Sequence, residues 1–146
     1  MNMMRLVPGA DTTASALNAE RIKLEAISQN IANANVTDAP GGGPYQRKEV
    51  VFESIINEAI SSGSSGGVNP SSVQAKIETD SDNEGPQIYD PEHPDADETT
   101  GYVQMPNVNI HEEMVDMILA SRSYEANLAA MKYGRRMATQ TLSIGR

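Results

Sequence analysis

Cysteine and tryptophan are absent from this chain of 146 residues, and phenylalanine occurs once. The lack of cysteine excludes disulfides and thiolate metal sites, and a single Phe without any Trp excludes an aromatic-rich core. No run of about 18 apolar residues occurs, so no membrane insertion is expected. The apolar residues gather in the first and last thirds, while residues 61–104 are rich in Gly, Pro, Ser and acids. This distribution predicts an elongated molecule.

Basic residues are also scarce, with 11 Lys and Arg against 20 Asp and Glu, which gives a net charge of −9. Nucleic acid is therefore not an expected partner, because contacts to phosphates need clustered Lys and Arg. The first 16 residues lack the apolar stretch of about 7–15 residues that a cleaved secretory signal needs. We therefore expect any export from the cytoplasm to use another route.

The first third of the chain predicts a helix that begins after a cap at Thr12 or Thr13 and runs to Asn35. Apolar residues recur along it in heptad spacing: Leu17, Leu24, Ile27, Ile31 and Ala34. A second apolar row lies on another face: Ala19, Ile22 and Ala26. Two rows predict two packing partners, although a core helix of a small bundle has the same pattern.

Three asparagines, Asn30, Asn33 and Asn35, stand among alanines at the end of this helix. Asparagine is a mediocre helix former, because its amide competes for nearby backbone groups. The proline- and glycine-rich run at 40–44 then ends the helix. A frayed helix end with a polar tail is one interpretation of this pattern.

The middle of the chain predicts extended structure and loops. We expect a strand around Val50–Phe52, with a helical turn over 52–60 as the alternative, a second strand over 73–79, and a short strand or extended segment over 101–105. Residues 61–72 have the composition of a flexible loop. Residues 78–98 contain nine acids and no Lys or Arg, so we expect a solvent-facing acidic loop.

The last third predicts the strongest element, a helix of about 35 residues and about 50 Å that starts at a capping box made by Asn109 and Glu112. Its heptad positions are Ile110, Met114, Met117, Ser121, Tyr124, Leu128, Met131, Arg135, Ala138 and Leu142. Long heptad helices pair with one another or with other subunits. The predicted fold is mainly α, with long N- and C-terminal helices paired as a coiled coil and an inserted extended or β-hairpin region. The corresponding segments are 1–35, 36–108 and 109–146.

No catalytic, cofactor or metal site is predicted. The stretch "DSDNEG" at 80–85 imitates the start of an EF-hand loop, but its twelfth position would be Pro91 and no helices flank it. His93 lies among acids without a second imidazole, and His111 lacks the second histidine one turn later that a zinc protease needs. No nucleophile elbow, phosphate loop or dinucleotide fingerprint occurs, so an enzyme is not expected.

Several motifs together resemble the axial proteins of the bacterial flagellum, the rod and hook subunits. "SALNAERIKLEAISQNIANANVT" (15–37) is similar to the N-terminal signature shared across that family. "GGPYQRKEVVF" (42–52) and the stretch from "YDPEHPDAD" to "YEANLAAM" (89–131) narrow the resemblance to subunits of the proximal rod. Residues 54–88 diverge from the family pattern.

The resemblance implies a structural protein of the flagellar basal body. Axial proteins are exported unfolded by the flagellar type III export apparatus, without a cleaved signal. They assemble with copies of themselves and with other rod subunits into a helical tube that crosses the periplasm and transmits motor torque. Their terminal helices pair into an inner layer, and an extended connector with β structure lies outside it.

On this basis we expect an assembly interface along both helices, formed by Leu17, Leu24, Ile27, Asn30, Ile31, Asn33, Asn35, Met114, Met117, Tyr124, Leu128, Met131 and Leu142. Asn30 and Asn33 are expected to donate hydrogen bonds across a helix–helix contact in the tube. The alternative function is a soluble helical module that binds one partner helix. A tube subunit should have incompletely folded ends when alone, whereas a binding module should be fully helical.

Overall fold

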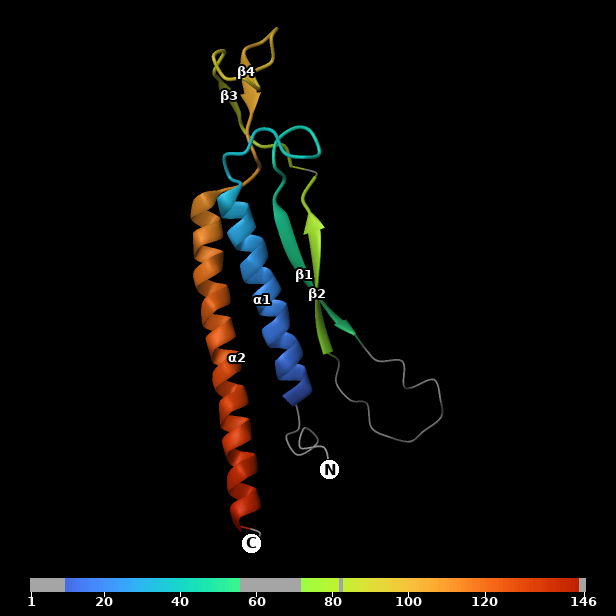
Figure 1. Cartoon of the computed structure of the whole chain (residues 1–146), viewed down its shortest axis with the longest axis vertical. Helices are drawn as coiled ribbons and strands as arrows, with labels where there is room; N and C mark the ends of the chain where they lie inside the picture. Colours follow the sequence, from blue (N-terminus) through green and yellow to red (C-terminus); the bar gives the residue numbers. More distant parts are fainter. Residues whose placement is uncertain (1–9, 56–71, 82, 145–146) are drawn as a thin grey trace, which may run out of the picture.

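The computed structural model describes residues 10–55, 72–81 and 83–144. Two helices, α1 (Ala10–Ala32) and α2 (Ile110–Ile144), lie side by side along the molecule. Two antiparallel strand pairs are inserted between them in sequence: β1 (Lys48–Ile55) with β2 (Ser72–Thr79), and β3 (Gln87–Tyr89) with β4 (Tyr102–Gln104). The molecule is elongated and mainly helical with a β insertion, as the sequence predicts (Figure 1).

Helix α1 forms the middle layer, between α2 on one side and the β1–β2 pair on the other (Figure 1). Ala19 and Ala26 of its second apolar row are buried, and Leu17, Leu24 and Ile31 of the first row are half-buried. The prediction of two packing partners is therefore confirmed.

The β1–β2 pair turns one face toward α1. Phe52 lies opposite Ala75 in the register, and its ring is 5.7 Å from the Nζ atom of Lys23 on α1. The backbone N–H of Val73 donates to the hydroxyl of Ser15, also on α1, over 3.1 Å. Since alternate residues of a strand face opposite sides, the intervening residues of both strands face away from α1.

The ends of α1 differ from the prediction. The helix begins at Ala10, so Thr12 and Thr13 lie inside its first turns and do not occupy the cap. It ends at Ala32, and Asn33 to Asn35 form turns. The backbone then reverses through Gly42 and Gly43, whose φ angles of 79° and 84° suit glycine.

Helix α2 has the predicted length of 35 residues. The Asn109 half of its predicted capping box is confirmed, because the side-chain oxygen of Asn109 accepts a hydrogen bond of 3.1 Å from the backbone N–H of His111. No helix in the described part of the chain combines the length and apolar character needed to cross a membrane.

The residues of α2 that face inward differ in phase from the predicted heptads. The buried and half-buried positions follow steps of four and three: Glu113, Met117, Ala120, Tyr124, Asn127 and Met131. Met117, Tyr124 and Met131 belong to the predicted seam. The other predicted row is displaced by one residue, so Met114 and Leu142 are exposed while Glu113 and Ala120 are buried.

The acidic region also contains a strand that the sequence did not predict. Residues 87–89 pair with residues 102–104, and the rings of Tyr89 and Tyr102 meet edge to face with centroids 5.3 Å apart. We call residues 87–104 the distal lobe. The predicted loop over 61–72 and the helical alternative beyond Ile55 lie almost entirely outside the described residues.

A narrow neck connects the distal lobe to the rest of the molecule. The carbonyl oxygen of Gly85 accepts a hydrogen bond from the Gln104 side chain over 2.5 Å, and Met105 N–H donates to the Pro86 carbonyl over 2.9 Å. A Cβ atom at position 85 would lie 2.1 Å from the Met105 oxygen and 2.6 Å from the Pro106 carbonyl carbon. Only glycine therefore allows the two backbones to approach this closely.

We predict that Gly85→Ala destabilises the neck, because the clash is with backbone atoms and the two segments must separate. The expected cost is about 1–3 kcal/mol, measured by thermal unfolding together with hydrogen exchange of the amides in the distal lobe. Gly41→Ala is the matched control, since a Cβ there meets nothing within 4 Å. Equal exchange rates in both variants would show that the neck does not constrain the lobe.

Candidate assembly site

Asn30 lies where α1, α2 and β1 meet, with 1% of its surface exposed. Its amide nitrogen donates to the Lys48 carbonyl over 2.9 Å and to the Glu113 carboxylate over 3.1 Å. Its amide oxygen accepts from the Tyr45 hydroxyl and from the Lys48 N–H, both over 2.9 Å. One side chain thus joins three elements, and we call Asn30, Tyr45, Arg47 and Glu113 the polar junction.

The carboxamide of Asn30 is fully used inside the chain. An asparagine side chain offers two N–H donors and an oxygen with two acceptor sites, and all four are occupied by the bonds just described. Asn30 is expected to hydrogen-bond across a helix–helix contact in the tube, and these bonds leave it no free group for a neighbouring subunit. Its contact across a helix pair is instead with α2 of its own chain.

Glu113 supplies the negative charge of the polar junction and is also 1% exposed. Its carboxylate forms an ion pair of 2.6 Å with Nε of Arg47, whose guanidinium also lies 3.7 Å from Asp116. The hydrogen bond to Glu113 raises the pKa of Arg47, although burial acts in the opposite direction. Burial raises the pKa of Tyr45, and the Glu113 charge raises it further. Tyr45 therefore stays protonated as the donor that Asn30 requires.

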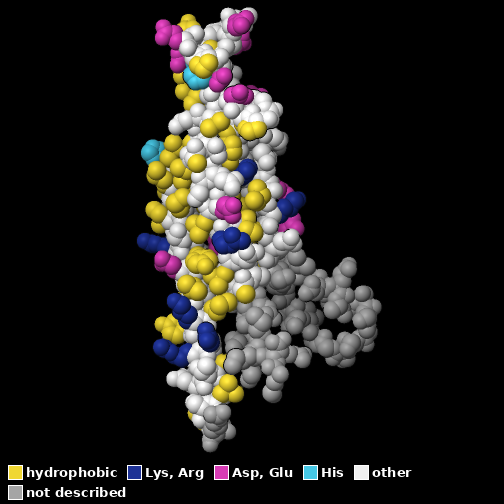
Figure 2. All heavy atoms as spheres, viewed as in Figure 1, with side chains coloured by type: hydrophobic (Ala, Val, Ile, Leu, Met, Phe, Trp, Pro, Cys, Tyr) yellow, Lys and Arg dark blue, Asp and Glu magenta, His cyan; other side chains and the backbone are white. Residues whose placement is uncertain are grey.

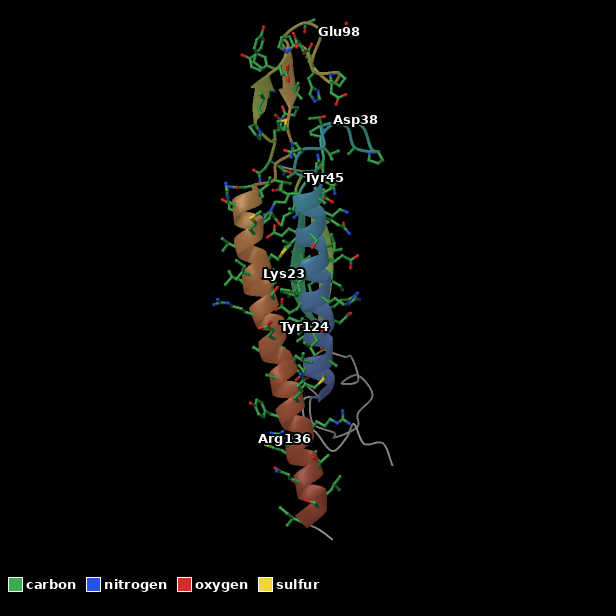
Figure 3. All side chains as sticks on the ribbon, turned by 60° about the vertical axis from the view of Figure 1, so that its left-hand side comes forward. Lys23, Asp38, Tyr45, Glu98, Tyr124 and Arg136 are labelled. Atoms are coloured by element: carbon green, nitrogen blue, oxygen red, sulfur yellow. The ribbon has the colours of Figure 1, made fainter. Side chains whose placement is uncertain are left out.

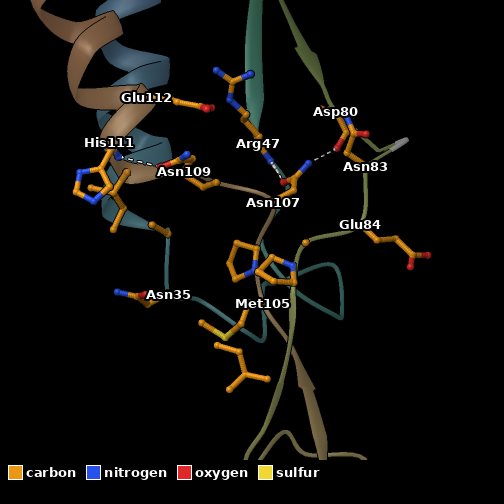
Figure 4. A pocket seen from close by; sticks show the side chains of 17 residues that line it. Asn35, Arg47, Asp80, Asn83, Glu84, Met105, Asn107, Asn109, His111 and Glu112 are labelled. Carbon is orange, nitrogen blue, oxygen red and sulfur yellow. Dashed lines mark hydrogen bonds between the residues drawn. The ribbon is translucent and has the colours of Figure 1, made fainter.

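The backbone of Arg47 continues this network toward the neck. Its N–H donates to the side-chain oxygen of Asn107 over 2.7 Å, and the Asn107 amide donates to the Asp80 carbonyl over 3.0 Å (Figure 4). Asn107 therefore links the start of β1 to the end of β2, just before α2 begins. An open hollow lies beside it, with Asn35 and Glu84 among the side chains around it.

The other two asparagines behave differently. The amide of Asn33 donates to the carbonyl of Gln29, four residues earlier, over 2.7 Å, so it closes the end of its own helix. Asn35 is exposed. The sequence alone did not separate Asn30 from Asn33, since the difference depends on residues that follow 15 or more positions later.

Four large apolar side chains are exposed together on α2: Met114, Val115, Ile118 and Leu119. They are between 50 and 59% exposed, and we call them the outer patch. Figure 2 shows hydrophobic side chains gathered along the edge where Figure 1 places this part of α2. Val115, Ile118 and Leu119 were missed from the sequence, although their spacing of three and four residues already indicates a second apolar face.

The remaining predicted interface residues are spread over both faces of the helix pair. Ile27 is buried. Half-buried residues are Leu17, Leu24, Ile31, Met117, Tyr124, Leu128 and Met131. Half-buried side chains keep part of their apolar surface available to a further contact.

No metal site is evident in the described part of the chain, where no three His, Asp or Glu side chains converge on a point. Asp82, the third position of the motif at 80–85, lies outside the described residues. His93 lies 3.9 Å from Asp95 on an exposed turn.

Two family models match the two ends of the chain. Residues 11–39 match the flagella basal body rod protein family, and residues 99–144 match the C-terminal family of flagellar basal body rod FlgEFG proteins. These segments contain most of α1 and all of α2, the paired helices of the structure. Together they define a rod protein of the flagellar basal body.

Curated relatives specify which rod protein family this is. The chain is 37% identical to the flagellar basal-body rod protein FlgC of Borreliella burgdorferi, over 97% of this chain and 98% of the relative. It is 40% identical to FlgC of Bacillus subtilis, over 93% and 95%, and 38% identical to FlgC of Salmonella typhimurium, over 97% and 99%. The chain therefore belongs to the FlgC family.

We predict that Asn30→Leu destabilises the folded chain strongly, because it leaves the Lys48 backbone groups and the Tyr45 and Glu113 side chains without their shared partner. At about 1–3 kcal/mol for each unsatisfied buried group, the expected loss is roughly 3–5 kcal/mol. Urea unfolding followed by circular dichroism measures it. Asn33→Leu is the control, with an expected change within about 1 kcal/mol, and equal losses in both variants would contradict a special role for Asn30.

We predict a smaller loss for Glu113→Gln, which keeps the shape of the side chain but leaves Arg47 with only its longer contact to Asp116. The expected cost is about 1–3 kcal/mol, below that of a fully buried ion pair, because Arg47 is partly exposed. The neighbouring Glu112 is exposed, so Glu112→Gln should leave the unfolding midpoint unchanged. An unfolding midpoint of Glu113→Gln equal to that of the wild type would mean that the charge contributes nothing to the stability of the polar junction.

Proposed function

We propose that this chain is a structural subunit of the proximal part of the flagellar basal-body rod, with α1 and α2 packed as a coiled coil in the inner layer of a helical tube. The observation that carries the proposal is the outer patch, a group of large apolar side chains exposed on a long helix in a member of the FlgC family. Monomeric soluble proteins rarely leave such a group uncovered. A neighbouring subunit is the cover that a rod supplies.

The small apolar core supports assembly as the source of stability. Among the described residues, the buried apolar side chains are Ala19, Ala26, Ile27, Ala34, Val103 and Ala120, most of them alanines. Alanine contributes far less on burial than the 1.5–3 kcal/mol typical of a Leu, Ile or Met side chain. Several larger apolar residues of α2, those of the outer patch, lie instead on its outside, where contacts between subunits would bury them.

The same features suit export before folding. A subunit with few buried large side chains unfolds at low cost, which favours passage through the flagellar type III export apparatus in an unfolded state. Residues 1–35 and 109–146 form the inner helical segments in this proposal, and 36–108 form the outer connector. Partners are further copies of this chain and other rod subunits, and the assembled rod transmits motor torque across the periplasm. The role is structural and involves no catalysis.

We predict that Leu119→Asp prevents rod assembly, because it places a charge in the middle of the outer patch, where a neighbour would bury it without a partner. Basal bodies isolated from cells that carry only this variant should lack intact rods, although the subunit is still exported. Ser123→Asp adds the same side chain at an exposed position of α2 outside the patch and should leave the rod count near that of the wild type.

Intact rods in the Leu119→Asp strain would remove the outer patch from the assembly contact. A chain that is absent from wild-type basal bodies would refute the rod assignment itself. If the isolated wild-type chain is fully helical and binds a single partner helix, the alternative of a soluble binding module gains support.

A further inference from the structure

The C-terminal end of α2 extends past the beginning of α1, as Figure 1 shows. Tyr133 and Met137 are each 63% exposed there. Arg136 is three residues from Tyr133, and Lys132 is four residues from Arg136, so both basic residues lie on the same side of the helix; both are exposed. This end of α2 therefore presents an apolar and basic helix face that no other described element covers.

The charge of this face is nearly all of one sign. From residue 117 to 144, α2 carries four basic side chains, Arg122, Lys132, Arg135 and Arg136, against the single acid Glu125. None of the ion pairs between described residues involves these four. Unpaired arginines beside exposed tyrosine and methionine are well suited to a protein partner that offers both carboxylates and apolar surface.

The distal lobe has the complementary properties. Its connecting loop carries Asp90, Glu92, Asp95, Asp97 and Glu98, and the lobe contains no Lys or Arg. Ile88, Tyr89 and Tyr102 expose between 47 and 65% of their surfaces. In Figure 2, acidic side chains gather at the upper end of the molecule, where Figure 1 places the distal lobe, whereas Lys and Arg lie lower.

The two complementary surfaces cannot meet within one chain. Figure 3 places Glu98 at one end of the molecule and Arg136 toward the other, separated by most of the length of α2, a helix of about 50 Å. We propose that the distal lobe of one copy docks on the basic C-terminal end of α2 of a second copy. This inference deepens the proposed function, since it specifies one contact between subunits of the rod.

Such a contact is heterologous, because different surfaces of the two copies meet. A heterologous contact leaves one free lobe and one free basic end on every pair, so it adds further copies in one direction. A contact between two identical surfaces would stop at a dimer. The number of copies in the cross-linked products therefore distinguishes the two kinds of contact.

The chain has no cysteine, so two introduced cysteines are unique labels. Thr100, on the distal lobe, and Ser143, near the end of α2, are both exposed. Basal bodies containing the double variant Thr100→Cys and Ser143→Cys are treated with a flexible bismaleimide. We expect a ladder of dimers, trimers and larger products, while each single-cysteine variant gives monomer.

A reversal of charge shows whether the contact is electrostatic. In the double-cysteine background, Lys132→Glu with Arg136→Glu should lower the yield of the ladder about five- to tenfold, and so should Glu92→Lys with Glu98→Lys. All four changes in one chain should restore most of the yield, because each lobe again meets an opposite charge. A general folding defect would not be rescued in this way.

Dimers from a single-cysteine variant, or a product that contains a different rod protein in place of the ladder, would overturn the proposal. Absence of the ladder from rods that do contain the chain would also overturn it, while the rod assignment stands. If the chain is missing from the basal bodies, both the rod assignment and the contact are refuted.

Discussion

The arrangement of this molecule depends on one carboxamide, that of Asn30. Its four hydrogen bonds fix the end of α1 against the beginning of α2 and the first strand of the β insertion. Glu113 and Arg47 extend the same network, and through Asn107 it reaches the neck below the distal lobe. Most of the buried apolar side chains among the described residues are alanines, which restrict the sliding and rotation of packed helices less than large interlocking side chains do. The polar junction removes this freedom, because a saturated buried network has one geometry in which all its members are satisfied.

Much of the fold could be predicted from local patterns. The length and cap of α2, the two strands β1 and β2, and the two packing faces of α1 follow from periodicity and from capping chemistry. The phase of α2 could not be predicted in this way, because apolar residues lie on both of its sides and Glu113 has the appearance of an ordinary acid in the first turn of a helix. Its burial depends on Asn30, 83 residues earlier in the sequence. Strand β3 was missed for a similar reason, since three residues in an acidic stretch form a strand only through pairing with β4.

The residues of the candidate assembly site could also be predicted from the sequence only in part. Periodicity identified Met117, Tyr124 and Met131, which face inward, but it did not show that Met114 faces outward with Val115, Ile118 and Leu119. A rule based on helix propensity does not distinguish the three asparagines from one another. They differ in the structure because Asn30 faces two other elements, Asn33 bonds to the carbonyl one turn earlier, and Asn35 lies in the following turn.

In this chain, the residues that fix the geometry of the fold differ from those that would contribute most to its stability. An ion pair such as Arg47–Glu113, with one partner buried, contributes little net stability compared with apolar packing of the same volume, but breaking it leaves a buried charge without its partner. Several of the large apolar side chains in the described part of the chain are instead exposed on α2. This division suits the proposed function, in which the subunit is exported unfolded and becomes rigid on assembly. The polar junction sets the angle between the helix pair and the β insertion, while in the proposed rod the contacts with neighbouring subunits would add stability. A tube that carries torque needs both properties, because a subunit whose parts rotate about each other would absorb the torque through deformation instead of passing it on.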